Sequence, residues 1–102
     1  MNAKIALNDR YKPSDKIVAR EIEGEIIIIP LAAGIGDIED ELYSLNETGR
    51  SIWKHLDGVN TVQDIIAQLT AHFAGDAAVI KRDVLGLLRE LKKRQFLVQK
   101  SV

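Results

Sequence analysis

Hydrophobic residues along this chain change their spacing, from the short apolar runs of strands to the longer period of helices. Residues 16–22 and 25–31 are rich in Ile and Val, and a two-residue turn signal that ends in Gly24 separates them. Two such runs around so short a turn predict an antiparallel hairpin. Because Gly24 readily takes the positive φ that the turn needs, the register is set and pairs Val18 with Ile29.

The apolar run at residues 26–29 consists of consecutive isoleucines without any alternation. Such a run is typical of a strand that is covered on both faces. A loop over residues 32–40 follows, and it carries acidic side chains near its end. Residues 41–45 then predict a short third strand.

From residue 46 onward, apolar side chains recur every three or four positions, which is the period of helices. Thr61 and Asp64 form a capping-box pattern, and Gly75 separates the last two helices. The third helix carries a continuous apolar stripe at Ile80, Val84, Leu87, Leu88 and Leu91. We expect helices over residues 47–56, 62–74 and 77–94, with N-terminal caps at Asn46, Thr61 and Asp76.

A three-stranded antiparallel sheet followed by three helices is an α+β arrangement, in which strands and helices are segregated along the chain. The length of 102 residues, with 46% hydrophobic and 28% charged residues, fits one soluble domain with one core. A domain of this size has little room for an enclosed active site, which favours a binding module over an enzyme.

Charge and composition exclude several classes of protein. Fourteen Lys and Arg residues against fifteen Asp and Glu residues give a net charge of -1, which lacks the basic field of a non-specific nucleic-acid binder. Cysteine is absent, so disulfides and thiolate metal sites are excluded. The N-terminal residues lack the apolar run of a signal peptide, and residues 26–35 are too short a run to cross a bilayer. We therefore expect a cytoplasmic protein that does not span a membrane.

Short motifs follow one another at defined spacings through the second half of the chain: Leu45-Asn46-Glu47-Thr48, Ile52-Trp53, Leu56-Asp57-Gly58, Thr61-Val62, Ile65, Asp83-Val84, Leu87-Leu88, Leu91 and Phe96-Leu97. Together with the hairpin around Gly24, they resemble the PqqD-like family over residues 16–98. The resemblance implies a winged helix-turn-helix-like fold and a non-catalytic recognition element for ribosomally synthesised, post-translationally modified peptides. It divides the chain into an N-terminal extension at residues 1–15, the domain at 16–98 and a C-terminal tail at 99–102.

The resemblance also implies a partner. In this family the leader of a precursor peptide adds as an extra strand to the third strand, lies against the third helix and delivers its core to a modifying enzyme. The subgroup that serves pyrroloquinoline quinone (PQQ) synthesis has Tyr-Pro-Glu-Gly and Gly-Trp-Leu segments where this chain has Pro30-Leu31-Ala32-Ala33 and Gln95-Phe96-Leu97. PQQ synthesis and another peptide pathway therefore both stay open, the latter with a radical enzyme that uses S-adenosylmethionine.

The third predicted strand offers the backbone edge that strand addition needs, because it is last in the strand order and lacks proline. Its side chains alternate, with Leu42 and Ser44 on one face and Tyr43 and Leu45 on the other. These four residues are the first part of the predicted peptide-binding site. The alternatives are an ordinary sheet edge without a ligand, or an edge that pairs with a second copy to give a homodimer.

The third helix supplies the second part of the predicted site. Lys81, Leu85, Leu88 and Lys92 follow one another at helical spacing and form a ridge beside the buried stripe. This ridge would offer an apolar floor with a cation at each end, which suits an apolar peptide that carries acidic residues. The alternative is a wide apolar face that packs on the sheet, with the lysine stems lying over it.

A winged-helix DNA-binding regulator is the competing interpretation, since the second and third helices could form a helix-turn-helix pair. Basic residues of the third helix concentrate at its C-terminal end, whereas base contacts in that motif come mainly from the N-terminal part, so peptide binding ranks higher. The sequence has no phosphate loop or nucleophile motif, and His55 and His72 lack a metal-ligand spacing. We expect no enzymatic activity, no cofactor and no metal.

Overall fold

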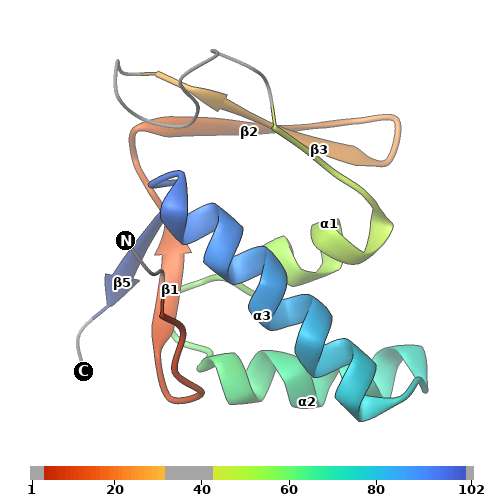
Figure 1. Cartoon of the computed structure of the whole chain (residues 1–102). Coiled ribbons are helices and arrows are strands. Elements are labelled where there is room, and N and C mark those ends of the chain that lie inside the picture. Colours follow the sequence, from red (N-terminus) through yellow and green to blue (C-terminus); the bar gives the residue numbers. More distant parts are fainter. Residues whose placement is uncertain (1–3, 32–42, 101–102) are drawn as a thin grey trace.

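Within residues 4–31 and 43–100, which the computed structural model describes, the chain forms two antiparallel sheets and three helices (Figure 1). In chain order the elements are β1 (Arg10–Pro13), β2 (Ile17–Ile22), β3 (Glu25–Pro30), β4 (Tyr43–Leu45), α1 (Glu47–Lys54), α2 (Val62–Phe73), α3 (Ala77–Lys93) and β5 (Leu97–Lys100). The predicted α+β class is confirmed.

β2 and β3 form the predicted hairpin in the predicted register. Val18 pairs with Ile29, and the two-residue turn is Glu23-Gly24. Both turn residues have positive φ, 52° at Glu23 and 82° at Gly24, as a type I′ turn requires. Such a turn matches the twist of the strands. Gly24 adopts its positive φ without steric cost, because glycine has no β-carbon. The turn residues therefore set the pairing of the whole hairpin.

β4 extends the hairpin into a three-stranded sheet of order β2-β3-β4. Ile26 of β3 lies opposite Leu45 of β4. In the part of the chain that the structure describes, β4 is thus the outer strand next to β3. Residues 43–45 of the predicted third strand are confirmed, whereas Leu42 and the residue before it lie outside the described residues.

The isoleucine run of β3 is fully covered on one face only. Ile26 and Ile28 are buried in the core, at 4% and 0% exposure. Ile27 and Ile29 point to the opposite face and stay partly exposed. The expectation of a strand covered on both faces is wrong, since the helices lie on one side of this sheet (Figure 1).

β1 and β5 form a second antiparallel sheet that sequence analysis missed. Arg10 pairs with Lys100, and Pro13 pairs with Leu97. Tyr11 in β1 is 1% exposed and belongs to the core. The segment expected as an N-terminal extension therefore contains a strand of the fold, and part of the expected C-terminal tail lies in β5. Both strands are too short to show a hydrophobic period in the sequence.

The three helices begin at the predicted caps. The Asn46 side chain accepts a hydrogen bond from the Gly49 amide at 2.9 Å, Thr61 and Asp64 form the reciprocal capping box, and Asp76 caps α3. Each cap satisfies an amide that its helix cannot pair internally. The C-terminal ends fall one or two residues before the predicted ones. None of the helices in the described part of the chain is long and apolar enough to cross a membrane.

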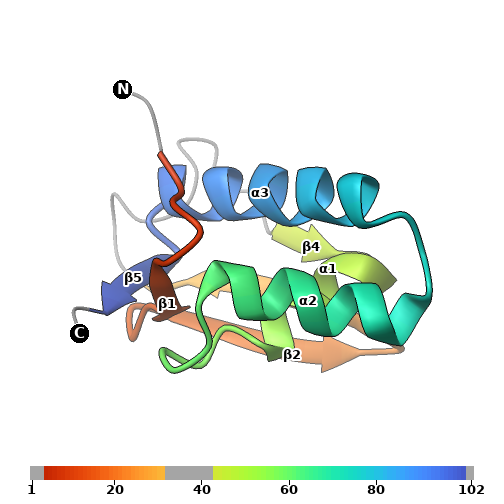
Figure 2. The same ribbon diagram turned by 90° about the horizontal axis from the view of Figure 1, so that it is seen from below.

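The core lies between the three-stranded sheet and the helices. Figures 1 and 2 show α1 between that sheet and α2, while α3 runs along one side of both helices. The β1–β5 sheet closes one end of the molecule (Figure 1). Fully buried side chains come from both sheets and all three helices, and among them are Tyr11, Ile28, Ile52, Val62, Ile65, Leu69, Val84, Leu88, Leu91 and Phe96.

Candidate functional site

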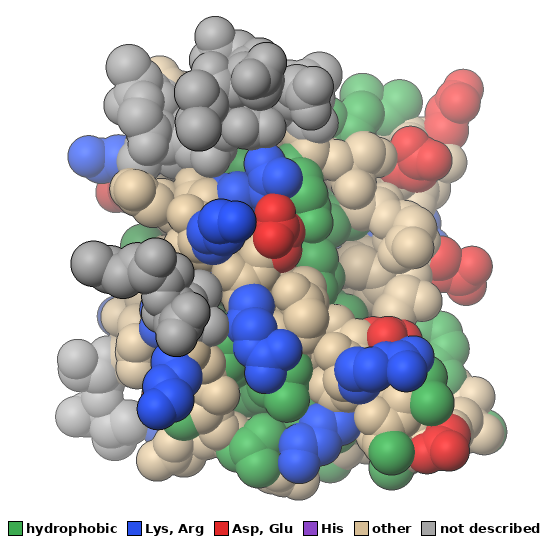
Figure 3. Space-filling model, viewed as in Figure 1, with side chains coloured by type: hydrophobic (Ala, Val, Ile, Leu, Met, Phe, Trp, Pro, Cys, Tyr) green, Lys and Arg blue, Asp and Glu red, His purple; other side chains and the backbone are tan. Residues whose placement is uncertain are grey.

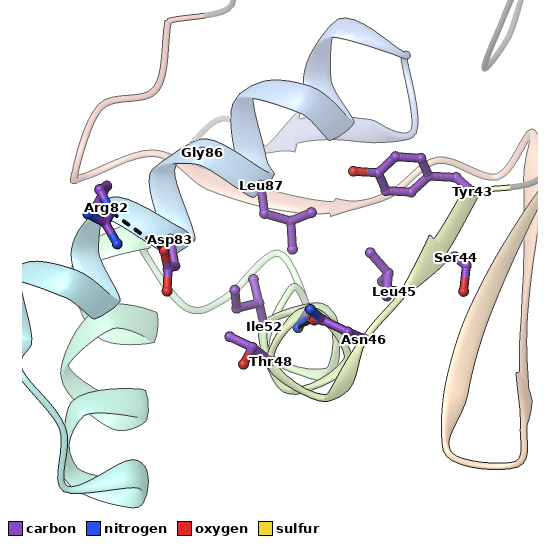
Figure 4. Close-up of a pocket in the computed structure, with 11 residues that line it drawn as sticks. Tyr43, Ser44, Leu45, Asn46, Thr48, Ile52, Arg82, Asp83, Gly86 and Leu87 are labelled. Carbon is purple, nitrogen blue, oxygen red and sulfur yellow. Dashed lines mark hydrogen bonds and ion pairs between the residues drawn. The ribbon is translucent and has the colours of Figure 1, made fainter.

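A groove of about 490 Å³ opens between β4, the start of α1 and the middle of α3 (Figure 4). β4 lines it along its whole length, and α1 contributes the exposed Thr48 and the buried Ile52. α3 faces them across the groove with residues that include Asp83, Gly86 and Leu87. The groove thus places a sheet edge and a helix face on one concave surface.

β4 turns its two faces to different surroundings. Leu45 is buried at 2% exposure and Tyr43 is partly buried, so both side chains face the helices. The Ser44 hydroxyl donates a hydrogen bond to a Glu25 carboxylate oxygen at 3.3 Å. Among the described strands, only β3 pairs with β4. The outer edge of β4 offers backbone amide and carbonyl groups of the kind that pair with an added strand.

The α3 wall combines a charged pair, an apolar side chain and bare backbone. The Arg82 guanidinium lies 3.7 Å from the Asp83 carboxylate, and at their exposure this ion pair adds little stability. Leu87 points into the groove (Figure 4). At Gly86, an added β-carbon would meet no atom within 4 Å. Glycine inside a helix costs about 1 kcal/mol relative to alanine, and the packing of the described residues offers no steric reason for it.

An aromatic and charged cluster flanks the groove at Tyr43. The Tyr43 ring meets Phe96 edge to face, with 5.9 Å between ring centroids. The Arg94 guanidinium lies 4.7 Å from the Tyr43 centroid, which is an attractive cation–π geometry. Glu90 holds this guanidinium, with 3.0 Å between Arg94 Nη2 and Glu90 Oε1. These contacts hold the Tyr43 ring in place at the β4 edge.

Both tyrosines of the chain have raised pKa values. Burial raises the pKa of Tyr43, the Glu90 carboxylate raises it further, and Arg94 opposes this rise. Burial also raises the pKa of Tyr11 well above its usual range, and the Tyr11 hydroxyl donates a hydrogen bond to Asp9 at 2.8 Å. In both cases the folded structure favours the neutral phenol over the phenolate.

We expect the protein to lose stability as the pH rises above about 10. A tyrosine whose pKa is raised by folding stabilises the native state fully below the pKa of the unfolded chain, and this contribution is lost as the pH rises through the folded pKa. Tyrosinate absorbance during a pH titration reports the ionisation, and urea unfolding at each pH reports the stability. Ordinary ionisation of both tyrosines near pH 10 without loss of stability would contradict this expectation.

The predicted strand residues lie together in the structure, whereas the residues of the predicted helix ridge lie in different surroundings. Tyr43, Ser44 and Leu45 all line the groove, whereas Leu42 lies outside the described residues. The predicted site has a strand part and a helix part. All described residues of the strand part therefore line the groove.

The helix ridge does not form one exposed surface. Leu88 is 0% exposed and belongs to the core. The Lys92 ammonium donates a hydrogen bond to a carbonyl of the N-terminal segment at 2.9 Å and lies 5.5 Å from the centroid of the Tyr11 ring. Lys81 and Leu85 line a separate hollow on α3. The wide apolar flank of α3 is thus divided between the core and the surface.

Most of the α3 wall of the groove is not predicted from the sequence. The helical pattern places Leu87 in the buried stripe, yet Leu87 is partly buried and its side chain also reaches the groove. Arg82, Asp83 and Gly86 are not part of the predicted site at all. Gly86 is the available signal, because a glycine inside a strong helical pattern weakens the helix and exposes its backbone.

Comparison with known proteins identifies one family whose model matches this chain. The family model of coenzyme PQQ synthesis protein D (PqqD) matches residues 28–97. The chain belongs to the PqqD family. The matched part begins within β3 and ends at the start of β5, so it contains every residue that lines the groove.

A relative of this PqqD-family chain is the PqqA binding protein of Acinetobacter baylyi. The two are 39% identical over 56 residues, which make up 55% of this chain and 56% of the relative. The chain therefore matches little more than half the length of that relative.

Two solved structures share the fold of this PqqD-family chain. The PqqD part of Methylobacterium extorquens PqqCD, a stand-alone recognition element for ribosomally synthesised and post-translationally modified peptides, has a TM-score of 0.72 at 21% identity, covering 94% of this chain and 96% of that one. TbiB1 in complex with the TbiA(beta) leader peptide has a TM-score of 0.69 at 24% identity, covering 84% and 93%. The shared fold is α+β, with three helices and antiparallel sheets.

Proposed function

We propose that this PqqD-family chain is a peptide chaperone, which binds the leader of a ribosomally synthesised precursor peptide and presents it to a modifying enzyme without catalysis of its own. The observation that carries the proposal is the groove, which sets the outer edge of β4 against a wall of α3. TbiB1, which shares the fold, was solved with a leader peptide, and the relative from A. baylyi is a PqqA binding protein. Both support a peptide as the ligand.

An extended peptide fits this groove by strand addition. Its backbone pairs with the outer edge of β4, and every second side chain turns toward the helices beside Tyr43 and Leu45. Those side chains meet Leu87 and the bare backbone at Gly86 on the α3 wall. The backbone pairing supplies affinity for many sequences, while the side-chain contacts select among them.

Several finer features belong to the same proposal. α2, α3 and the β2–β3 hairpin make up a winged helix-turn-helix-like frame that binds a peptide. The chain acts in the cytoplasm, and the modifying enzyme belongs either to PQQ synthesis or to another peptide pathway with a radical enzyme that uses S-adenosylmethionine. A homodimer through β4 would compete with the peptide, because both need the same edge.

An NMR titration with the leader peptide encoded beside this protein's gene tests the proposal. We expect the largest backbone amide shifts in β4, at Thr48 and at Asp83, Gly86 and Leu87 of α3, because the added strand contacts these parts of the groove. Calorimetry on the same pair is expected to give a micromolar or tighter dissociation constant. A scrambled peptide of equal composition is the control and should cause no shifts at β4.

A different pattern of shifts would overturn the proposal. Shifts confined to α3 on addition of duplex DNA, with binding that weakens steeply as salt is raised, would support the DNA-binding regulator instead. Shifts at β4 that depend on protein concentration and are unaffected by the leader would point to a homodimer edge.

A further inference from the structure

α3 carries a second concave surface beside the groove. This hollow has a volume of about 310 Å³ and is lined by Ala78, Lys81, Arg82, Leu85 and Arg89. Leu85 lies two positions from Leu87, about 200° around the helix, so the two leucines face opposite sides of α3. Figure 3 shows Lys and Arg side chains along this face of the molecule, with apolar surface between them.

The hollow has a positive charge and an apolar floor. Neither Lys81 nor Arg89 forms an ion pair within residues 4–31 and 43–100. Arg82 reaches the Asp83 carboxylate at 3.7 Å, but 75% of the Arg82 side chain is exposed. Leu85 is partly buried and packs against the core, which makes it a firm floor. Such a surface attracts an apolar side chain with acidic neighbours.

Gly86 connects the hollow to the groove. Arg82 lines both concave surfaces, and Gly86 lies one helical turn further along α3. An added β-carbon at Gly86 would meet no atom within 4 Å, so the helix surface at this point is bare backbone. A peptide can therefore cross α3 here in close contact with the helix, which a side chain at position 86 would prevent.

We propose that the peptide held at β4 continues across α3 at Gly86 and places an apolar residue with acidic neighbours in the hollow around Leu85. This inference rests on the proposed function, because it extends the same peptide beyond the groove. Lys81 and Arg89 bind the carboxylates, and Leu85 takes the apolar side chain. The proposed ligand is therefore a peptide in which a strand-forming segment is joined to a segment with acidic and apolar residues.

The chemistry of the hollow favours this peptide over a nucleic acid. A phosphate backbone gains nothing from an apolar floor such as Leu85, and the chain as a whole has a net charge of -1. The shared wall at Arg82 favours the peptide in the groove over a separate protein, because a chain that already occupies the groove enters the hollow as an intramolecular event.

Charge reversal in the hollow tests the inference. The probes are the leader peptide encoded beside this protein's gene and the same peptide with its Asp and Glu residues replaced by Asn and Gln. We expect Lys81→Glu with Arg89→Glu to weaken binding of the leader by about tenfold in calorimetry, and to leave binding of the amide peptide unchanged. The control, Lys12→Glu with Lys16→Glu, changes the net charge equally at exposed positions away from α3 and should leave leader binding unchanged.

Gly86→Leu tests whether the peptide lies close against α3, at a position that the groove and the crossing point share. We expect about tenfold weaker leader binding, because the added side chain blocks the path over α3. The thermal unfolding midpoint should not fall, since leucine favours a helix more than glycine does and the space at this position is free. Weaker binding together with unchanged or higher stability therefore locates the effect at the ligand.

Two results would overturn the inference, and they are distinguishable. Leader binding that is equal for the unmodified protein and the Lys81→Glu, Arg89→Glu variant would remove the hollow from the site while the proposed function stands. Failure of the unmodified protein to bind the leader would remove the proposed function as well. Variants are compared after circular dichroism has shown that each is folded.

Discussion

Thr48→Trp is expected to lower the affinity for the leader peptide by about 100-fold. Thr48 is exposed on α1 and lines the groove below α3 (Figure 4). An indole at this position fills the space beside β4 that an added strand needs. Thr48 forms no side-chain hydrogen bond to another described residue, so the free energy of unfolding should change by less than about 1 kcal/mol. Calorimetry with the leader measures the affinity, and urea unfolding measures the stability.

Lys54→Trp is the matched control for this substitution. Lys54 lies on the same helix, is 56% exposed and is not part of the groove, while its ion pair with Glu21 at 3.5 Å is a surface pair of small energetic weight. Its replacement adds the same indole without filling the groove, so leader affinity should stay within about twofold of the unmodified protein. Equal leader affinity for the Thr48→Trp and Lys54→Trp variants would show that the peptide binds elsewhere.

Local sequence signals were sufficient for the helices and the hairpin. Asn46 and the Thr61–Asp64 pair place the starts of α1 and α2, because each side chain satisfies amides that no other group in the helix can. Gly24 determines the turn of the hairpin in the same local way. Such signals depend on a few neighbouring residues, so they can be detected before any tertiary contact is known.

The β1–β5 sheet could not be detected in this way. Its two strands come from opposite ends of the chain, and each is only four residues long. Tyr11 and Leu97 are the buried residues of these strands, and a single buried side chain in each gives no alternation to recognise. The two strands pair because the helices place β5 beside β1. This placement depends on the whole fold.

The candidate site is also predictable from the sequence only in part. Local signals identify its strand edge, whereas tertiary contacts determine its helix wall. β4 was predicted as the accessible edge because strand order alone puts it last. The sequence predicts a binding surface on the flank of Leu85 and Lys81, whereas the groove is lined by the flank of Leu87 and Asp83. Both flanks border the same buried stripe, and the sequence of an amphipathic helix does not state which one faces the sheet.

Tyr11→Ala is expected to reduce the free energy of unfolding by about 3–5 kcal/mol, as for other large aromatic residues removed from a core. Tyr11 is 1% exposed, and it connects the β1–β5 sheet to the rest of the core. Typical domains have only about 5–15 kcal/mol of stability, so the variant should be close to unfolding at ordinary temperature. Urea unfolding followed by the fluorescence of Trp53, which is the single tryptophan of the chain, measures the loss.

Two further variants at β1 serve as controls. One separates the packing of the Tyr11 ring from the hydrogen bonding of its hydroxyl, and the other changes a neighbouring position on the same strand. Tyr11→Phe keeps the ring and removes the hydroxyl, which donates a hydrogen bond to Asp9 and accepts one from Lys92, so it should cost about 1–2 kcal/mol. Lys12→Ala changes an exposed neighbour on the same strand and should cost less than about 0.5 kcal/mol. If Tyr11→Ala were as stable as Lys12→Ala, residues 1–15 would be an extension after all. A large loss at Tyr11 alone would instead show that the PqqD-family domain of this chain starts at β1, and that a fragment beginning at residue 16 lacks part of the core.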